Sequence, residues 1–286
     1  MSVEPAVAFI PYGAKLGLAP SLFSLDRAFW PLGQPQRLVG KKLKDLSVDD
    51  HVLMYVNDTV HFRPSFGTRA KVSLLVMEPR AIHGRHLDRL QKSSSRFYKI
   101  FSHNEEFLSK CHNAEMLAFG TTWVPDWQEL KIKKTKNMSL IASKKASLEG
   151  HALRHEMVDW LKESQIDFEA LGGAYKAFDR KSDGLAPYRF SVVIENVRER
   201  NYFTEKLLDA IFCETVPIYW GCPNISDFFD TSAMMVCDTK EELERAILKV
   251  NDQTYSERVN RLRELKSDAA KYVALERRAA ESLLAV

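Results

Sequence analysis

Cysteine is scarce in this sequence, and its placement argues against a metal site. The 286 residues include four cysteines, and no two of them form a Cys-x-x-Cys pair. His112 is the one histidine beside a cysteine, and it provides no spacing that matches a zinc site. Free thiols are typical of a reducing compartment, so we expect a cytoplasmic protein. The four are Cys111, Cys213, Cys222 and Cys237.

Long apolar runs are also missing. No stretch approaches the roughly 18 apolar residues that mark a membrane-spanning helix. The apolar run 7–10 near the N-terminus is short and meets Pro11, unlike the core of a secretory signal. We therefore expect a protein without a membrane span.

The sequence lacks a large excess of either positive or negative charge. The sequence has 41 Lys and Arg against 38 Asp and Glu, a formal net charge of +3. No basic stripe is interleaved with aromatic residues, so a nucleic-acid partner is not expected. The 45% hydrophobic and 28% charged residues are typical of a globular protein. A chain of this length can form one large or two medium domains.

The stretch 188–229 carries the clearest pattern in the chain. An apolar, β-branched run at 190–194 is typical of a strand buried on both faces. Apolar residues at helical spacing then predict a helix over 204–213 with Thr204 as its N-cap. A second apolar run at 216–220 predicts another buried strand. Strand, helix and strand at this spacing form a βαβ unit, which implies a parallel sheet.

Polar residues lie where parallel sheets bind ligands. Glu195 and Asn196 follow the first strand at its carboxyl end, beside the start of the helix. Lys206 in the first helical turn opposes the helix dipole at a cost of roughly 0.3–1 kcal/mol, which suggests that its charge serves another purpose. With the helix N-terminus it could bind a phosphate, and Glu205 could accept hydrogen bonds from sugar hydroxyls. The alternative is a solvated Glu–Lys pair on an ordinary helix.

Three short motifs follow one another in this stretch: YxFxxxxEN, YxTEK and TVPxYWGxPN. They comprise Tyr188, Phe190, Glu195, Asn196, Tyr202, Thr204, Glu205, Lys206 and the segment 215–224. Together they resemble the donor-binding motif of the α1,3/α1,4-fucosyltransferase family. The resemblance implies an α/β fold of the GT-B class, with two Rossmann-like half-domains and a ligand cleft between them. Golgi members of the family have a stem and membrane anchor, so this sequence resembles the soluble bacterial or viral type.

Strands alternate with helices through the rest of the chain, which predicts a second α/β half. The lysine-rich segment 123–136 is the best candidate for a linker. We therefore expect an acceptor-side domain at residues 1–130 and a nucleotide-sugar-binding domain with a basic helical tail at residues 131–286. Predicted strands outside the motifs are 6–10, 52–56, 72–77, 98–101, 115–119, 139–142, 168–171 and 234–236, and predicted helices include 86–91 and 105–111.

Sugar transfer with inversion requires a base that takes the proton of the acceptor hydroxyl. Glu78 ends the apolar strand 72–77, where partial burial would raise its pKa, so Glu78 is the candidate base. In the resembled family the base is a glutamate after a comparable strand, usually in a Gly-Glu-Asn context, whereas Met77 and Pro79 flank it here. The alternative is a capping or ion-paired glutamate at a strand end.

The departing diphosphate requires positive groups, and the candidates are Lys206 and Arg154. Arg154 lies near the start of the helix after strand 139–142, and arginine binds phosphate bidentately. The resembled family has an arginine at the matching place; the alternative here is a surface arginine on a helix. The candidates for binding nucleotide and sugar are Glu195, Asn196, Tyr202 and Glu205, with the Tyr202 ring packing against the ligand.

No Asp-x-Asp pair follows a strand, so we expect no metal ion and no cofactor. The expected function is inverting transfer from a GDP-sugar, GDP-fucose first among them, to a glycan acceptor that the sequence does not specify. The alternatives are another GDP-deoxyhexose donor, or a catalytically silent nucleotide- or carbohydrate-binding protein of the same fold. The basic tail from Lys240 either contacts an anionic membrane surface or is a solvated helix face.

Overall fold

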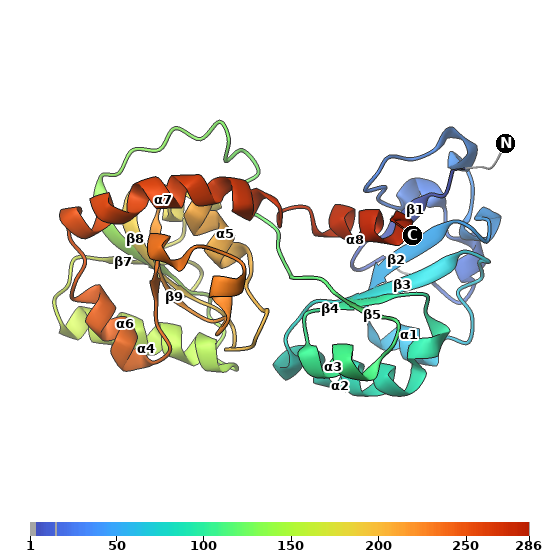
Figure 1. The fold of residues 1–286 in the computed structure, drawn as a ribbon, viewed down its shortest axis with the longest axis horizontal. Coiled ribbons are helices and arrows are strands. Elements are labelled where there is room, and N and C mark those ends of the chain that lie inside the picture. The colour runs from blue at the N-terminus through green and yellow to red at the C-terminus, as the bar shows by residue number, and fades with distance from the viewer. Residues whose placement is uncertain (1–3, 15, 286) are drawn as a thin grey trace. The chain divides into compact units, whose positions relative to one another are not determined.

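The chain forms two compact units (Figure 1). The computed structural model describes residues 4–14 and 16–285. The first unit comprises Met1–Ala118 and Ala274–Val286, and the second comprises Phe119–Val273. Each unit contains a five-stranded sheet in which every strand pair is parallel. The predicted α/β class with two parallel sheets is confirmed.

The sheet of the first unit follows the chain order β1-β2-β3-β4-β5. Right-handed crossovers that step in one direction leave their helices on one face of a sheet. The helices α1, α2 and α3 accordingly lie together below this sheet (Figure 1). The strands are β1 (Val7–Ile10), β2 (His51–Tyr55), β3 (Lys71–Val76), β4 (Ile100–Ser102) and β5 (Ala114–Met116), and the helices are α1 (Asp58–Phe62), α2 (Arg80–Ser93) and α3 (Glu105–Lys110).

The opposite face of the first sheet is covered by the last helix of the chain, α8 (Leu275–Leu284). Phe9 and Leu53 are buried although they lie outside the core cluster built on the other face. Leu275 and Leu283 of α8 are buried as well, and α8 packs along β1. The crossover helices of the first sheet leave this face bare, and α8 covers it. The C-terminal helix therefore belongs to the first unit and not to the expected domain at residues 131–286.

The lysine-rich segment 123–136 belongs to the second unit and does not separate the two. The ring of Trp127 stacks on Phe212 with centroids 4.4 Å apart. The ammonium group of Lys134 donates hydrogen bonds of 2.7 Å to two backbone carbonyls, at the start of β8 and just after α5. Because these contacts attach the segment to the second core, the units divide at Phe119 rather than after residue 130.

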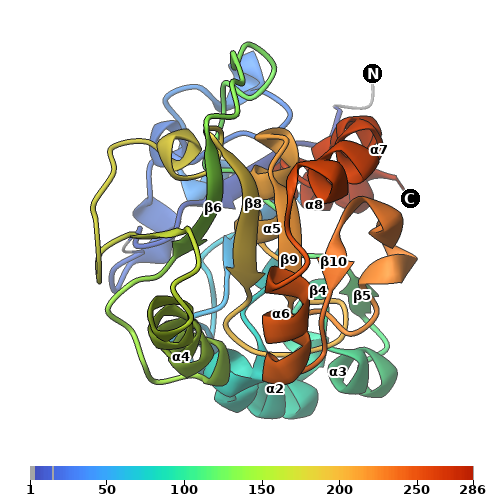
Figure 2. The same cartoon turned by 90° about the vertical axis from the view of Figure 1, so that its left-hand side faces the viewer.

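The second sheet has the order β10-β9-β8-β6-β7. The chain runs from β6 outward to β7 and then returns to the other side of β6 with β8, and Figure 2 shows β6 and β8 side by side. This reversal between β6 and β8 is the topological switch point of an open α/β sheet. The strands are β6 (Lys136–Ile141), β7 (Glu169–Leu171), β8 (Tyr188–Ile194), β9 (Val216–Trp220) and β10 (Met235–Val236).

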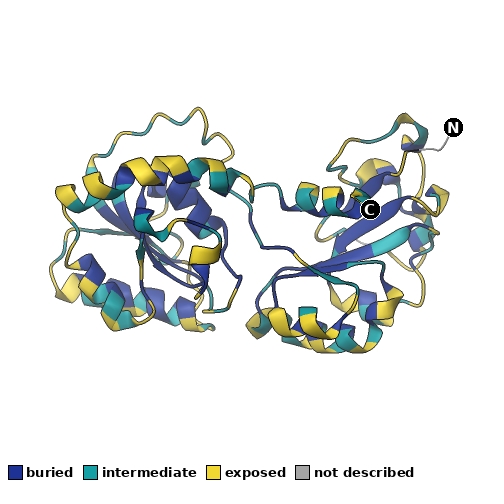
Figure 3. Ribbon diagram, viewed as in Figure 1, coloured by how far each residue is buried: buried dark blue, intermediate teal, exposed yellow. Residues whose placement is uncertain are grey.

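Helices cover both faces of the second sheet. One face carries α4 (Glu149–Glu163) and α6 (Lys240–Ile247), and the other carries α5 (Glu205–Phe212) and α7 (Asp252–Ala270) (Figure 1). The central strands β8 and β9 are buried while the outward helix faces are exposed (Figure 3). Burial on both faces explains why the strands read as continuous apolar runs.

The predicted elements are largely found, and one helix differs clearly. The helix expected over 86–91 begins at Arg80, directly after Pro79, and extends to Ser93. Proline at this place precedes the helix without removing a hydrogen bond inside it. Within residues 4–14 and 16–285, no helix is long and apolar enough to cross a membrane.

Candidate functional site

The carboxyl ends of β6 and β8 flank the switch point, where open parallel sheets bind their ligands. Gly150, near the start of α4, lies directly against the end of β8. Its amide donates a 3.0 Å hydrogen bond to the carbonyl of Asn196. A Cβ atom at Gly150 would lie 1.8 Å from the carbonyl oxygen of Glu195, so only glycine permits this approach. The approach fixes α4 beside the predicted site residues.

Glu195 joins β8 to the helix that follows it. Its carboxylate accepts hydrogen bonds from the amide and the hydroxyl of Thr204, at 2.8 and 2.7 Å. Glu195 is fully buried, and a Cβ atom at Gly221 would lie 2.5 Å from its Cγ atom. Burial raises the pKa of Glu195, while the Lys206 charge and the Thr204 hydrogen bonds oppose that rise. With no exposed surface, Glu195 orients the N-terminus of α5 rather than contacting a ligand itself.

Lys206 carries a charge that the protein holds in place. Its ammonium nitrogen lies 3.0 Å from the hydroxyl of Thr204, 3.1 Å from Oε1 of Glu205 and 3.5 Å from Oε2 of Glu195. Burial lowers the pKa of Lys206, but the two carboxylates outweigh burial and the pKa is raised. They also offset the unfavourable helix dipole. Because 22% of the side chain is exposed, the cation remains accessible to an anion.

Arg154 lies in the second turn of α4 and reaches the same strand end. Its Nε donates a 2.9 Å hydrogen bond to the carbonyl of Ile194, and its Nη2 donates a 3.1 Å hydrogen bond to Oδ1 of Asn196. Burial lowers the pKa of Arg154, and the charges of Glu195 and Glu205 oppose that change. The alternative of a surface arginine is wrong, because Arg154 is only 5% exposed.

Tyr202 was expected to pack its ring against a ligand, but the structure buries it, with 2% exposed. Its hydroxyl lies 3.5 Å from Nδ2 of Asn196 and can accept a hydrogen bond from it. The loop that contains Tyr202 is fixed by two 2.8 Å hydrogen bonds between Asn201 and Asn224. The sequence analysis did not predict this role of Asn224, although its place in the Pro-Asn pair that ends the third motif could have indicated it.

Lys181 is a charged residue of the second unit that the sequence analysis did not identify. The ammonium group of Lys181 lies 5.6 Å from the centroid of the Trp123 ring. Burial lowers the pKa of Lys181, and the carboxylates of Asp209 and Glu205 act against this. Lys181 and Trp123 line a cavity of about 770 Å³ at the carboxyl ends of β6 and β7. No local motif marks this pair, because the two residues are distant in the sequence.

Asp209 connects α5 to the start of the second unit. Its Oδ1 accepts hydrogen bonds from the hydroxyl of Thr122 at 2.6 Å and from the amide of Trp123 at 3.1 Å. Its Oδ2 is buried without a partner. Burial raises the pKa of Asp209 to about 7, with the Thr122 hydrogen bond and the Lys181 charge opposing the rise.

Asp209→Asn should therefore change how stability depends on pH. The native carboxyl holds its proton up to about pH 7 and the unfolded one only to its ordinary value of 3.8, so rising pH destabilises the wild type in this window. Between these pH values the free energy of unfolding should decrease by about 2–4 kcal/mol less in the variant than in the wild type. Guanidinium unfolding near pH 4.5 and pH 7.5 measures it, with Asp159→Asn on exposed α4 as the control. Equal pH slopes for wild type and Asp209→Asn would contradict the assignment.

Glu78 lies two residues beyond the end of β3, at the carboxyl edge of the first sheet, and is half-buried. Tyr55 ends the neighbouring strand β2. Burial raises the pKa of Tyr55 far above its ordinary range, and the charges of Glu276 and Glu78 add to this rise. The position at the end of the third strand is the one expected for Glu78.

In the part of the chain that the structure describes, no group of three or more His, Cys, Asp and Glu side chains could hold a metal ion. The four cysteines are buried and unpaired.

Solved structures identify the fold. A solved structure of an α1,3-fucosyltransferase with GDP-fucose matches 99% of this chain and 91% of its own, with a TM-score of 0.52 and 16% identity. The Staphylococcus aureus protein TarM matches 84% of this chain and 56% of its own, with a TM-score of 0.56 and 13% identity. The fold is that of the GT-B glycosyltransferases, as the motifs implied.

The family follows from the sequence of the second unit. The model of glycosyltransferase family 10 (fucosyltransferase), C-terminal part, matches residues 131–275, just over half of the chain. The chain belongs to this family, which confirms the resemblance of its motifs. An α-(1,3)-fucosyltransferase of Helicobacter pylori is 43% identical over 61 residues, which are 21% of this chain and 13% of that protein. The chain thus matches about an eighth of that relative's length.

Proposed function

We propose that this protein is an inverting glycosyltransferase that transfers fucose from GDP-fucose to a hydroxyl group of a glycan acceptor. The observation that carries the proposal is the group of Lys206, Glu205 and Arg154 at the switch point, within the residues that the family model matches. Cationic side chains beside a helix N-terminus favour a diphosphate. The names of the Helicobacter pylori relative and of the solved α1,3-fucosyltransferase support fucose as the sugar.

Each residue of this group has a part in binding the donor. Lys206 and Arg154 neutralise the diphosphate as it departs, which makes a metal ion or other cofactor unnecessary in this proposal. Glu205 accepts hydrogen bonds from sugar hydroxyls, and Asn196 presents its amide beside Arg154. Glu195 and Tyr202 are buried, so they hold the donor-binding side chains in position without contacting the donor.

The nucleoside has a cavity of suitable size in the same unit. The cavity of about 770 Å³ lies within the usual range of roughly 300–1,000 Å³ for ligand pockets. Trp123 presents a ring that is 63% exposed, and Gly173, where a Cβ atom would meet nothing within 4 Å, lets a ligand approach the backbone on the cavity wall. A flat aromatic face beside bare backbone suits a purine base.

Glu78 supplies the base of the proposed reaction. It removes the proton of the acceptor hydroxyl, whose oxygen forms a bond to the anomeric carbon of fucose. The bond from that carbon to the phosphate oxygen breaks, its electron pair leaves with GDP, and the configuration inverts. This assigns proton removal to the first unit and donor binding to the second.

The compartment and the basic tail complete the proposal. Four buried, unpaired cysteines support a reducing compartment, for which we propose the cytoplasm. Acidic side chains within the protein pair with most of the basic tail, which supports a solvated helix face over contact with a membrane. These pairs are Lys240 with Glu156, Arg245 with Glu242, Arg258 with Glu257, Arg263 and Lys266 with Glu214, Lys271 with Asp268, and Arg277 with Glu281.

Lys206→Ala should weaken GDP binding at least tenfold, because a charge-assisted contact to phosphate contributes roughly 1.5–3 kcal/mol. Calorimetric titration with GDP, UDP and GDP-fucose measures the effect, and the wild type should prefer the guanine nucleotides. Lys240→Ala is the matched control, since Lys240 pairs with Glu156 on the surface of the same unit. Affinity for GDP that is indifferent to Lys206 would contradict the site. A wild type that binds GDP without transferring fucose would favour a silent binding protein.

A further inference from the structure

Two histidines connect α1 to α2 in the first unit. Nε2 of His61, on α1, lies 2.7 Å from Nδ1 of His86, on α2. The two rings also stack, with centroids 5.0 Å apart and planes at 14°. A hydrogen bond between two imidazole nitrogens needs a proton on one and a lone pair on the other. The contact therefore exists only while at least one of the rings is neutral.

The buried side of His61 decides where the proton lies. Nδ1 of His61 is buried, and it has no hydrogen-bond partner among the residues that the structure describes. A proton on this atom would be a buried donor without an acceptor, which is unfavourable. His61 is therefore neutral, with its proton on Nε2, and donates to Nδ1 of His86. A proton added to His86 places two N–H groups face to face, and one added to His61 lies on the buried Nδ1, so either one disrupts the pair.

The surroundings of the pair also disfavour an added proton. Burial lowers the pKa of His61 and of His86 below the ordinary 6.5, and nearby arginines lower both further, while Asp58 opposes the change. His83 meets His86 edge to face at 5.1 Å, and burial, with the charges of His86 and His103, lowers the pKa of His83 to about 4. The groups that face the pair are Asp58 of α1, His83, Arg85 and Arg89 of α2, and Arg96 of the turn that follows α2.

Two other side-chain contacts between α1 and α2 are exposed to solvent. Asp58 forms a 2.6 Å ion pair with Arg85, but more than half of each side chain is exposed. Arg89 lies over the ring of Phe62 at 5.4 Å, and that ring is exposed as well. Exposed ion pairs contribute little to stability. The half-buried histidine pair is therefore the contact through which pH can act on α1.

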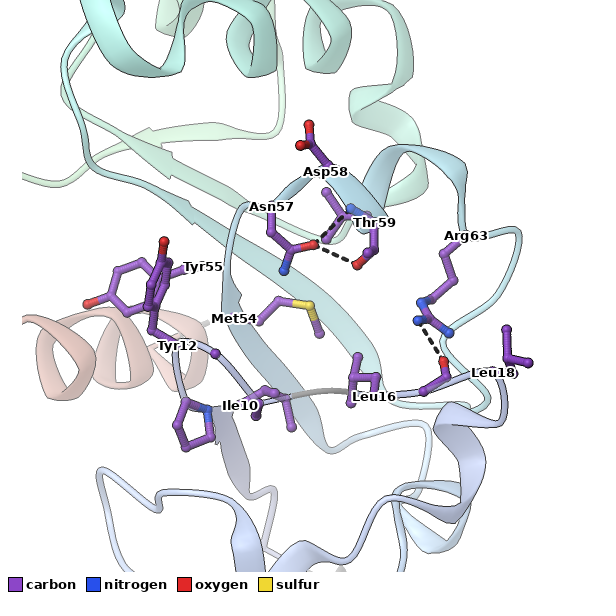
Figure 4. Close-up of a pocket in the computed structure, with 15 residues that line it drawn as sticks. Ile10, Tyr12, Leu16, Leu18, Met54, Tyr55, Asn57, Asp58, Thr59 and Arg63 are labelled. Atoms are coloured by element: carbon purple, nitrogen blue, oxygen red, sulfur yellow. Dashed lines mark hydrogen bonds between the residues drawn. The ribbon is translucent and has the colours of Figure 1, made fainter.

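The helix α1 forms one wall of a cavity of about 580 Å³ at the carboxyl ends of β1 and β2 (Figure 4). Asn57, Thr59 and Val60 line this wall. Just after the helix, Arg63 donates a 2.9 Å hydrogen bond to the carbonyl of Gly17, in the loop that follows β1 and lines another wall (Figure 4). A movement of α1 away from α2 therefore changes the shape of the cavity.

We propose that His61 and His86 form a pH-dependent latch, which holds α1 at neutral pH and loosens this wall of the cavity in weakly acidic solution. The latch lies wholly in the first unit and does not depend on the proposed donor or reaction. Because both folded-state pKa values lie below the unfolded value of 6.5, the stabilisation by the pair is fully present above pH 6.5. It is lost as the pH falls and the rings take up protons, since two positive rings in contact repel each other.

Hydrogen exchange of the α1 amides, relative to an unstructured peptide of the same sequence at the same pH, measures the latch. In the wild type, the protection of α1 should be about tenfold lower at pH 5.0 than at pH 7.5, which corresponds to the loss of one hydrogen bond. The double variant His61→Gln with His86→Gln retains groups that donate and accept but do not titrate, so its protection should be the same at both pH values. Equal protection of the wild type at both pH values overturns the proposal, and so does an equal loss in the double variant.

The matched control is His112→Gln, because His112 is an exposed histidine of the same unit. This variant should respond to pH like the wild type, and a lost response would overturn the assignment to His61 and His86.

Long-range ¹H–¹⁵N NMR spectra of the wild type decide the proposal even if the double variant does not fold. His61 should carry its proton on Nε2 at pH 7.5. The rings of His61 and His86 should take up protons below pH 6.5, together with the fall in α1 protection. The single variants His61→Gln and His86→Gln assign the signals. A protonated His61 at pH 7.5, or rings that take up protons without any change in α1, overturns the proposal.

Discussion

Glu78→Gln should lower kcat for fucosyl transfer by about 10²–10⁴-fold, the usual contribution of a general base. Glutamine has nearly the same shape as glutamate but cannot take the acceptor proton. Because donor binding is assigned to the second unit, the affinity for GDP should stay unchanged. Initial rates with GDP-fucose and a glycan acceptor measure the first effect, and calorimetry with GDP measures the second.

The control for this variant is Glu106→Gln, which changes the same charge on the same unit. Glu106 is exposed on α3 and pairs with Lys110, so its loss should leave kcat unaltered. Full turnover by Glu78→Gln would exclude Glu78 as the base. A parallel loss of GDP affinity would mean that the substitution acts through the fold.

Gly150→Ala should destabilise the second unit on the order of 3 kcal/mol or more, because overpacking forces backbone to move. The added Cβ atom would lie 1.8 Å from the carbonyl oxygen of Glu195, a backbone atom that no side-chain rotation can displace. Relief requires α4 to separate from β8. That movement would break the hydrogen bond from Gly150 to Asn196 and shift Arg154. GDP affinity should fall together with stability.

Gly84→Ala provides the matched control in a helix of the first unit. A Cβ atom there would meet the Arg80 side chain at 3.4 Å, an ordinary contact. Alanine in place of glycine at such a site should stabilise the helix by about 0.4–1 kcal/mol. Denaturant unfolding of both variants measures the contrast. Wild-type stability in Gly150→Ala would show that α4 and β8 are not packed as closely as described.

Local patterns predicted most of the strands and the helix α5, because a parallel sheet covered on both faces demands continuous apolar runs. They also brought Glu195 and Lys206 to one site, since both lie beside a single strand–helix junction. The burial of Tyr202 was not predictable, because a tyrosine in a motif is equally compatible with a ring that contacts a ligand and with a ring that packs in the core. The burial of Arg154, which excludes the alternative of a surface arginine, was also not predictable from its place on a helix.

Contacts between distant segments were beyond the sequence reasoning. The pairing of Tyr55 with Glu276 and the pairing of Thr122 with Asp209 depend on which surfaces the fold brings together. An amphipathic pattern shows that α8 buries one face, but it does not say against which sheet. The unit boundaries at Phe119 and Ala274 follow from that choice.

The return of α8 to the first unit also determines the order in which the protein can mature on the ribosome. Domains usually complete their folding from the N-terminal end as synthesis proceeds. Here the second unit lies wholly between the two segments of the first, so all of its residues emerge before the first unit has its last helix. Until then the sheet face that contains Phe9 and Leu53 has no cover, and the nascent chain carries an apolar surface for most of its synthesis.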